Sequence, residues 1–326
     1  MIPRFLFLVH PLLPWQGRVI GLRIQASDLV RGRLDRLRSP HAGRLCRLGI
    51  PGMVNGEVVS IPRLPEQLLT DQDDALEQMV RAVEAQDPAP DAVGLGSLLA
   101  VVAGRGTALA ERVTPPVTTG AAATTWAALG NTLEVLERTR ERRVAVLGFG
   151  GTVGQALAQA LVEAGVEVTV GGKGRKLERQ AAKLGVPIAD DPEAVRGHRV
   201  VVGAATTGGT LEPSALEPDT VLLDVALPPT LKPGPRPPGV RVLAGEAVEL
   251  PSGLRRGVFG RPYQLIAGYG LRQLYACLTE PMLMAAQGRT EPFAQGRRLS
   301  PQAIEAFAEA ARRVGLKPRL AWDETR

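Results

Sequence analysis

Three glycines with the spacing of a phosphate-binding turn are the first residues that point to chemistry. Gly148, Gly151 and Gly154 follow an apolar run at 143–147 and precede an expected helix at 152–164. Glycine at the first position permits a tight turn, and at the second it lets the backbone approach a pyrophosphate. At the third it lets the helix, whose N-terminus attracts phosphate, pack on the strand. The turn predicts dinucleotide binding; the alternative is a glycine-rich turn that binds no nucleotide.

The residues after the next expected strand, at 166–170, indicate which nicotinamide cofactor would bind. An NAD site usually has an acidic side chain there for the ribose 2′-hydroxyl. This chain continues Gly171-Gly-Lys173-Gly-Arg175-Lys, and its next carboxylate is Glu178. Because cations suit a 2′-phosphate, the sequence favours NADPH, with a basic helix start on the surface as the alternative.

Cys277 is the one candidate nucleophile that the local sequence supports. It lies in an expected helix over 264–287, where Pro281, four residues later, cannot donate to the Cys277 carbonyl and predicts a kink beside the sulfur. Glu280 and Gln273 are expected one turn to either side. From spacing alone, an inert core cysteine remains the alternative.

The other cysteine, Cys46, is expected to be a small buried hydrophobe. The sequence has no zinc-finger spacing, and we expect no metal site.

Short valine-rich runs that alternate with helical segments predict an α/β fold. We expect a Rossmann-like, doubly wound parallel sheet, with an amino-terminal α/β domain before it and carboxy-terminal helices after it. The strands expected in the Rossmann part are 143–147, 166–170, 186–189, 199–203, 221–224 and 240–244. Those expected before it are 5–9, 58–61, 93–95 and 116–118. Helices are expected at 65–86, 121–140, 152–164, 174–184, 264–287 and 300–315.

These elements suggest three consecutive domains. Residues 1–140 would form the amino-terminal domain that meets substrate or carrier, 141–262 the NADP-binding domain, and 263–326 the helices that carry the thiol. The proline-rich stretch at 228–239 is expected to be a stiff loop.

Composition narrows the class of protein and of partner. The chain has 326 residues, a formal net charge of +6 and 44% apolar residues, which excludes a largely disordered chain. Two cysteines and the lack of a run of about 18 apolar residues favour a reduced, cytoplasmic protein without a transmembrane segment. Basic segments at 18–47 and 252–272 favour an acidic partner or, alternatively, form a solvated face. Nucleic acid is disfavoured because aromatic residues make up only 4%, while peripheral membrane contact and oligomeric state stay open.

Several segments resemble the aldehyde-forming long-chain acyl-[acyl-carrier-protein] reductases. The segment Tyr275-Ala-Cys277-Leu-Thr-Glu280 is similar to the family's Y/F-A-C-x-A-E. Further segments that resemble the family are Phe7–Pro11, Ile61–Leu69, Gly94–Ser97, Pro116–Gly120, Gly148–Gly154, Leu223–Pro228 and Ile304–Leu316. The likeness covers much of the chain and indicates a divergent member or close relative.

The resemblance implies a reaction. In that family an acyl thioester passes its acyl group to a cysteine, matched here by Cys277, and hydride from NADPH releases the aldehyde. The implied partner is an acidic acyl carrier protein or acyl-CoA. Backbone N–H groups near Thr119 and Gly120, or after the strand at 199–203, would stabilise the oxyanion. The cofactor contacts we expect are Gly148, Gly151, Thr152, Val153, Gly154, Lys173, Arg175, Ala204, Thr206, Thr119 and Gly120.

Some positions depart from the family pattern. Ala121 stands where the family has asparagine, Lys173 where it has arginine, and Pro281 where it has a small helix former. A catalytically silent NADPH-binding or carrier-binding regulator is therefore a second hypothesis. A shikimate-dehydrogenase-like enzyme is a third, although that chemistry uses an amino-terminal lysine and none occurs before Lys173.

Overall fold

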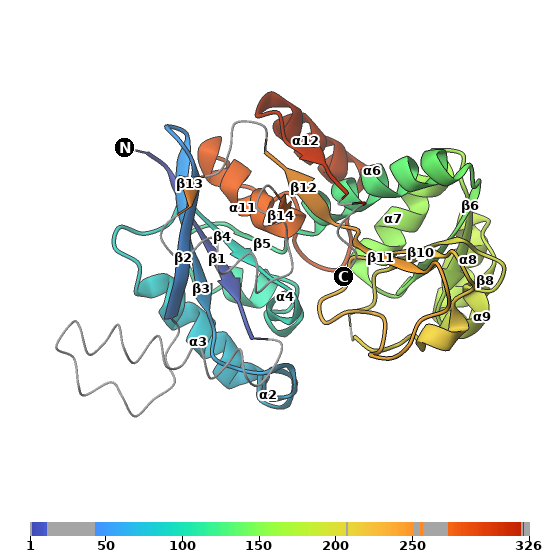
Figure 1. Cartoon of the computed structure of the whole chain (residues 1–326). Coiled ribbons are helices and arrows are strands. Elements are labelled where there is room, and N and C mark those ends of the chain that lie inside the picture. Colours follow the sequence, from blue (N-terminus) through green and yellow to red (C-terminus); the bar gives the residue numbers. More distant parts are fainter. Residues whose placement is uncertain are drawn as a thin grey trace. The chain divides into compact units, whose positions relative to one another are not determined.

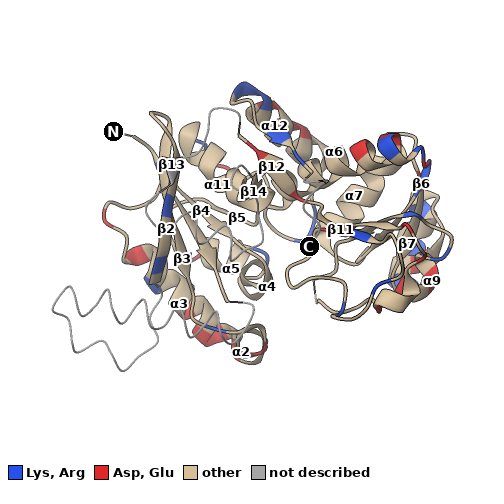
Figure 2. Cartoon of the chain, viewed as in Figure 1, with Lys and Arg blue, Asp and Glu red and all other residues tan. Residues whose placement is uncertain are grey.

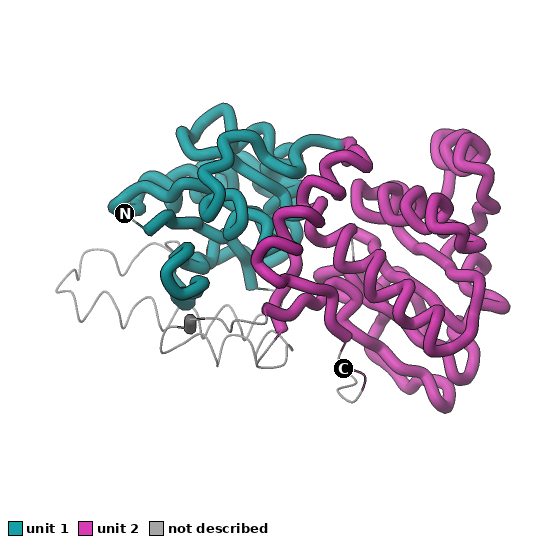
Figure 3. The backbone as a smooth tube through the Cα atoms, turned by 90° about the horizontal axis from the view of Figure 1, so that it is seen from above, with its two compact units in different colours: residues 1–120, 252–267, 277–297 teal, residues 121–251, 268–276, 298–326 magenta. Residues whose placement is uncertain are grey.

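The computed structural model describes residues 2–11, 43–206, 208–250, 255–256, 273–320 and 322, and for 255–256 the backbone only. It divides into two compact units (Figure 3). Unit 1 comprises residues 1–120, 252–267 and 277–297, and unit 2 comprises residues 121–251, 268–276 and 298–326.

Unit 1 is built on a mixed sheet with the order β13-β2-β3-β1-β4-β5 among the described residues (Figure 1). Its strands are β1 (Arg4–Val9), β2 (Gly43–Ile50), β3 (Val54–Ser60), β4 (Ala92–Leu95), β5 (Val117–Thr118) and β13 (Arg255–Arg256). β3, β1, β4 and β5 run parallel, while β2 pairs antiparallel with β3 and with β13. The helices are α2 (Pro65–Thr70), α3 (Gln72–Glu84), α4 (Leu98–Val102), α5 (Thr107–Ala110) and α11 (Ala276–Ala286).

The two faces of this sheet are covered by different helices. Leu6 and Leu8 of β1 belong to a core that includes residues of α2 to α5. On β4, a Cβ at Gly94 would overlap the ring of Pro281, so α11 packs on the sheet at that glycine. The helix that carries Cys277 therefore rests directly on the strands.

Unit 2 contains the doubly wound sheet that the sequence predicts. Among the described residues its order is β11-β10-β9-β6-β7-β8 with every pairing parallel, the 3-2-1-4-5-6 order of a Rossmann fold. The strands are β6 (Arg143–Leu147), β7 (Glu167–Gly171), β8 (Ile188–Ala189), β9 (Val200–Gly203), β10 (Val221–Asp224) and β11 (Arg241–Ala244). The helices are α6 (Ala121–Thr139), α7 (Thr152–Glu163), α8 (Arg175–Leu184), α9 (Asp191–Ala194), α12 (Pro301–Arg313) and the 3-10 helix η2 (Pro213–Ala215).

Both faces of this sheet are buried. Alternate residues of β6 point into two separate cores, Val144 and Val146 into one and Ala145 and Leu147 into the other. Continuous apolar strands are what a parallel sheet with covered faces requires. A small antiparallel sheet of β12 (Ala247–Glu249), β14 (Gln273–Tyr275) and β15 (Lys317–Pro318) completes the described part of unit 2.

The structure differs from several sequence-based expectations. The single helix expected over 65–86 breaks at Asp71, whose side chain accepts from Asp74 N–H and caps α3. In the helix expected over 264–287, residues 273–275 instead form β14, which pairs with β12, and α11 begins at Ala276. β2 was not expected at all.

The compact units also do not follow the three consecutive domains expected at 1–140, 141–262 and 263–326. The units differ from these domains because segments distant in sequence contact one another. α6 packs against α7 and lies with unit 2, whereas β13 and most of α11 return to the sheet of unit 1.

Candidate active site

The glycine turn has the geometry that its spacing predicts. It connects β6 to α7, and Gly148 has φ of +77°, with the position of a Cβ only 2.5 Å from the carbonyl carbon of Ala204. A Cβ on Gly154 would overlap the carbonyl oxygen of Gly148. Glycine is therefore required at both positions, by backbone conformation at the first and by helix packing at the second. Gly151 is the N-cap of α7 and carries no side chain at the point where a pyrophosphate approaches a Rossmann helix.

Two further loops lie at the same edge of the unit 2 sheet. Ala204 follows β9 and donates its N–H to Leu147 at 3.1 Å, and a Cβ on Gly151 would lie 3.6 Å from Thr206 Oγ1. The structure thus brings Ala204 and Thr206 to the glycine turn, as expected. Buried Asp224, the last residue of β10, accepts from the N–H groups of Ala226 and Thr230 at 3.2 and 2.9 Å and so fixes the loop that follows.

The sheet edge at the end of β7 holds carboxylates as well as the cations expected from the sequence. Lys173 follows β7, and Arg175 is the exposed first residue of α8. Lys173 Nζ forms an ion pair with Asp190 Oδ2 at 2.8 Å, and this contact raises the pKa of Lys173. Asp190 and Asp191 directly follow β8, which lies beside β7. Sequence inspection missed these two carboxylates because they are distant along the chain; the expected strand at 186–189 was the one indication that they would reach this edge.

An open, basic hollow of about 420 Å³ lies along α8. Its lining residues are Arg175, Lys176, Arg179, Gln180 and Lys183. The cations expected near the cofactor therefore continue along this helix, and they make α8 an anion-attracting surface.

The thiol lies in the first turn of α11. Cys277 is the second residue of this helix and is half-buried. The carbonyl of Glu246 accepts from the preceding Ala276 N–H at 3.2 Å, so the start of the helix is held by backbone. The N-terminus of a helix stabilises a thiolate, an effect that the mid-helix position expected from the sequence would not provide.

Gly120 packs directly on Cys277. It has φ of +75°, and a Cβ at this position would lie 2.6 Å from Cys277 Cα and 3.0 Å from the Cys277 carbonyl oxygen. Thr119 precedes it and donates its N–H to the Ala294 carbonyl at 3.0 Å. The structure therefore places Gly120 against Cys277 within unit 1, with Thr119 as its neighbour in sequence.

A buried contact ties the helix of the thiol to β5. The hydroxyl of Thr118 donates to Glu280 Oε1 and also lies 3.1 Å from the Ala294 carbonyl oxygen. The side chains of Thr118 and Glu280 are both fully buried. Glu280 is one helical turn from Cys277, as expected, whereas Gln273 lies in β14 and is no helical neighbour of the thiol. The role of Thr118 was missed because nothing in its local sequence points to Glu280.

The candidate residues thus fall into two sets. Unit 2 holds the glycine turn with Thr152 and Val153, the β9 loop, Lys173 and Arg175, and unit 1 holds Cys277, Thr119 and Gly120. The residues expected to contact the cofactor's phosphates lie in unit 2, and Cys277 and the residues beside it lie in unit 1.

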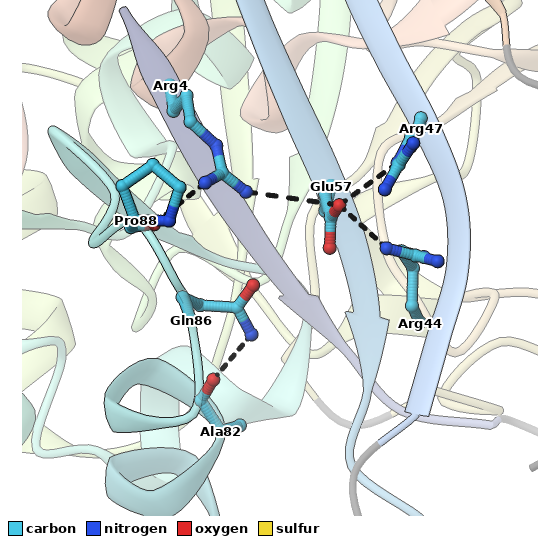
Figure 4. Close-up of polar contacts among 7 residues, drawn as sticks. All are labelled: Arg4, Arg44, Arg47, Glu57, Ala82, Gln86 and Pro88. Atoms are coloured by element: carbon cyan, nitrogen blue, oxygen red, sulfur yellow. Dashed lines mark hydrogen bonds and ion pairs between the residues drawn. The ribbon is translucent and has the colours of Figure 1, made fainter. Parts of the chain in front are cut away.

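The basic segments expected to meet an acidic partner lie largely outside the described residues. Of 18–47, Arg44 and Arg47 are described, and both contact Glu57 Oε1, at 3.0 and 3.1 Å (Figure 4). Arg4 approaches the same oxygen at 3.9 Å. Three guanidinium groups around one carboxylate leave an excess of positive charge on this part of the sheet. The side chains of 252–272 are not described.

Comparison with known proteins identifies the nucleotide-binding part. Residues 143–225 match the family described as NADP oxidoreductase, coenzyme F420-dependent. With the parallel sheet and the glycine turn, this match makes the segment an NAD(P)-binding Rossmann fold of the oxidoreductase type. None of the described helices is long and apolar enough to cross a membrane.

Relatives of the chain carry different names. It is 26% identical to the aminotransferase PigE of Serratia sp., over 96% of this chain and 39% of that protein. It is 29% identical to a long-chain acyl-[acyl-carrier-protein] reductase of Synechococcus elongatus, over 54% of this chain and 52% of that protein. The chain thus spans about half of these relatives' lengths or less. Among solved structures, the Trypanosoma brucei N5,N10-methylenetetrahydrofolate dehydrogenase-cyclohydrolase, complexed with NADP cofactor and inhibitor, is 13% identical with a TM-score of 0.35, covering 74% of this chain and 79% of that one.

Proposed function

We propose that this chain reduces an acyl thioester to an aldehyde, with NADPH as the reductant and Cys277 as the residue that carries the acyl group. The observation that carries the proposal is the position of Cys277, half-buried in the first turn of α11 with Gly120 packed on its backbone. The partial likeness to an acyl-[acyl-carrier-protein] reductase supports it.

In the first step the Cys277 thiolate attacks the acyl carbon of the incoming thioester. The bond from that carbon to the carrier sulfur breaks, and the carrier thiolate leaves and takes up a proton. The N-terminus of α11 favours the thiolate, and a backbone N–H would stabilise the oxyanion. That N–H would come from the Thr119–Gly120 segment, where Thr119 N–H donates to the Ala294 carbonyl at 3.0 Å and Gly120 N–H lies 3.5 Å from Thr118 Oγ1.

In the second step the acyl group leaves Cys277 as the aldehyde. NADPH held at the glycine turn would supply the hydride to the acyl carbon, and breakage of the carbon–sulfur bond would then restore the Cys277 thiolate. The glycine turn of unit 2 fits the cofactor because Gly151, the N-cap of α7, carries no side chain where the pyrophosphate would lie. Overall, thioester, NADPH and a proton give aldehyde, free thiol and NADP⁺.

The partner and the form of the cofactor belong to this proposal. Lys173 and Arg175 favour the 2′-phosphate of NADPH. An acidic acyl carrier protein, or acyl-CoA, would deliver the acyl group, and the basic segments at 18–47 and 252–272 would attract it. We propose a cytoplasmic setting, where a catalytic thiol stays reduced.

The likeness to an aminotransferase is compatible with this chemistry. Aminotransferases that use pyridoxal phosphate hold it on a lysine in the active site. All five lysines of this chain, at 173, 176, 183, 232 and 317, are exposed. An aldehyde, the product proposed here, is a class of substrate that an aminotransferase converts to an amine.

The test is an aldehyde assay with matched cysteine variants. Purified protein is incubated with NADPH and acyl-carrier-protein or acyl-CoA thioesters of several chain lengths. We expect aldehyde from the wild type and from Cys46→Ser, and none from Cys277→Ser. Aldehyde formation by Cys277→Ser at the wild-type rate would contradict the proposal. NADPH binding without turnover of any thioester would favour the silent regulator instead.

A further inference from the structure

A lysine that follows β7 lies at the same sheet edge as two carboxylates that follow β8. β7 and β8 are parallel with Gly171 opposite Ala189, and Gly172 N–H donates to the Ala189 carbonyl at 2.9 Å. The residues that follow the two strands, Lys173 on one side and Asp190 on the other, therefore meet at one edge.

Asp190 contacts Lys173, and Asp191 lies against Gly171. Lys173 Nζ and Asp190 Oδ2 are 2.8 Å apart. A Cβ on Gly171 would overlap Asp191 Oδ1 and lie 3.4 Å from Asp191 Cγ. Asp191 thus occupies the space of the side chain that β7 lacks at its last residue. Asp190 is the N-cap of α9, and Asp191 is the first residue of this helix (Figure 2).

The charges at this edge influence one another. Burial raises the pKa of Asp191, and the neighbouring charge of Asp190 raises it further. The hydrogen bond and charge of Asp190, with a smaller contribution from Asp191, raise the pKa of Lys173. A new anion placed here would meet a lysine that already has a partner and two carboxylates that repel it.

A Rossmann sheet of this strand order places the ribose 2′ group of the cofactor at this point. The end of the second strand, β7 here, is where an acidic residue binds the 2′-hydroxyl of NAD or a cation binds the 2′-phosphate of NADP. A phosphate monoester carries a charge of about −1.5 to −2 at neutral pH.

We propose that Asp190 competes with the 2′-phosphate for Lys173, and that Asp190 and Asp191 together set the preference between NADP(H) and NAD(H). Asp191, at the start of α9, supplies the carboxylate that is absent at the end of β7, and Asp190 neutralises the lysine that would otherwise select the phosphate. The preference for NADPH over NADH is then modest. This inference rests on the nicotinamide site of the proposed function, not on its acyl chemistry.

The test measures binding of NADP⁺ and NAD⁺ by calorimetry, without any acyl substrate. Asp190→Asn should tighten NADP⁺ binding by roughly threefold to tenfold, as expected for release of an exposed ion pair and of like-charge repulsion, and change NAD⁺ binding less than about twofold. Asp191→Asn should weaken NAD⁺ binding and strengthen NADP⁺ binding. The gain from Asp190→Asn should shrink at high salt, since these groups are exposed.

Two controls separate this competition from a general charge effect. Glu193→Gln removes an acid of α9 that pairs with Arg196 at 3.0 Å, and we expect it to leave the NADP⁺ to NAD⁺ ratio unchanged. In a Lys173→Met background, Asp190→Asn should lose most of its effect on NADP⁺ binding.

Three outcomes would overturn the inference. One is an unchanged ratio of NADP⁺ to NAD⁺ affinity in Asp190→Asn, and a second is an equal gain in both affinities. The third is a wild type that binds neither nucleotide, which would also overturn the proposed function. A protein that binds nucleotide with the expected shifts but forms no aldehyde would sustain this inference and refute the acyl chemistry.

Discussion

Replacing Gly120 with alanine tests whether the backbone at this residue positions the thiol. An alanine at φ of +75° costs about 1–2 kcal/mol of stability from backbone strain alone. Its Cβ would lie 2.6 Å from Cys277 Cα, a distance that must open by about 0.9 Å to reach ordinary contact. Such overpacking costs about 1–3 kcal/mol more. We therefore expect a total loss of about 2–5 kcal/mol in the free energy of unfolding.

Gly52→Ala is the matched control. Gly52 also lies in unit 1 and has φ of +74°, but its Cβ position has no atom within 4 Å. This variant should lose only the strain term of about 1–2 kcal/mol and keep its activity. The difference between the two variants isolates the contact with Cys277.

The assays are urea unfolding and the rate of Cys277 acylation followed by mass spectrometry. A displacement near 1 Å at a reacting group lowers rates by about a hundredfold, and we expect a loss of that order in Gly120→Ala. Equal stability losses in Gly120→Ala and Gly52→Ala, together with wild-type acylation in both, would refute the packing of Gly120 on the thiol.

Three further predictions concern buried and titratable groups. Iodoacetamide should label Cys277, in the first turn of α11, at least about tenfold faster than Cys46, which is buried in β2; equal rates by peptide mass spectrometry would contradict an activated thiol. Thr118→Val removes a partner of buried Glu280 and should lower the free energy of unfolding by about 1–3 kcal/mol, whereas Thr118→Ser should recover most of it; similar losses in both would show that the hydroxyl does not matter. Burial lowers the pKa of His10, so below about pH 6.5 the unfolded chain binds more protons than the folded one, and the free energy of unfolding decreases as the pH is lowered. His10→Gln should reduce the slope of the free energy of unfolding, measured in urea, against pH between about pH 7 and 5; an unchanged slope would contradict this.

The doubly wound sheet was predictable because the local sequence of each strand and helix indicates its type. Short valine-rich runs such as 200–203 alternate with helical segments, and Gly148 must be glycine for reasons confined to its own turn. The parallel order then follows from the helical connections between strands. The site residues found this way are those whose chemistry depends on close neighbours in sequence.

The parts that sequence inspection missed depend on partners far along the chain. Tyr275 looks helical by pattern, yet it pairs with Ala247 in a strand, and this places Cys277 at the start of a helix rather than in its middle. The contact of Thr118 with Glu280 joins residues 162 positions apart. Asp190 reaches Lys173 only through the pairing of β8 with β7.

A two-stage experiment tests whether Cys277 carries the acyl group. The protein is first incubated with acyl-carrier-protein thioester without NADPH, and the mass of the Cys277 peptide is determined; NADPH is then added and aldehyde is measured. We expect an acyl adduct at Cys277 in the first stage and its stoichiometric loss as aldehyde in the second. An unmodified Cys277, or an adduct that persists when NADPH is added, would contradict it.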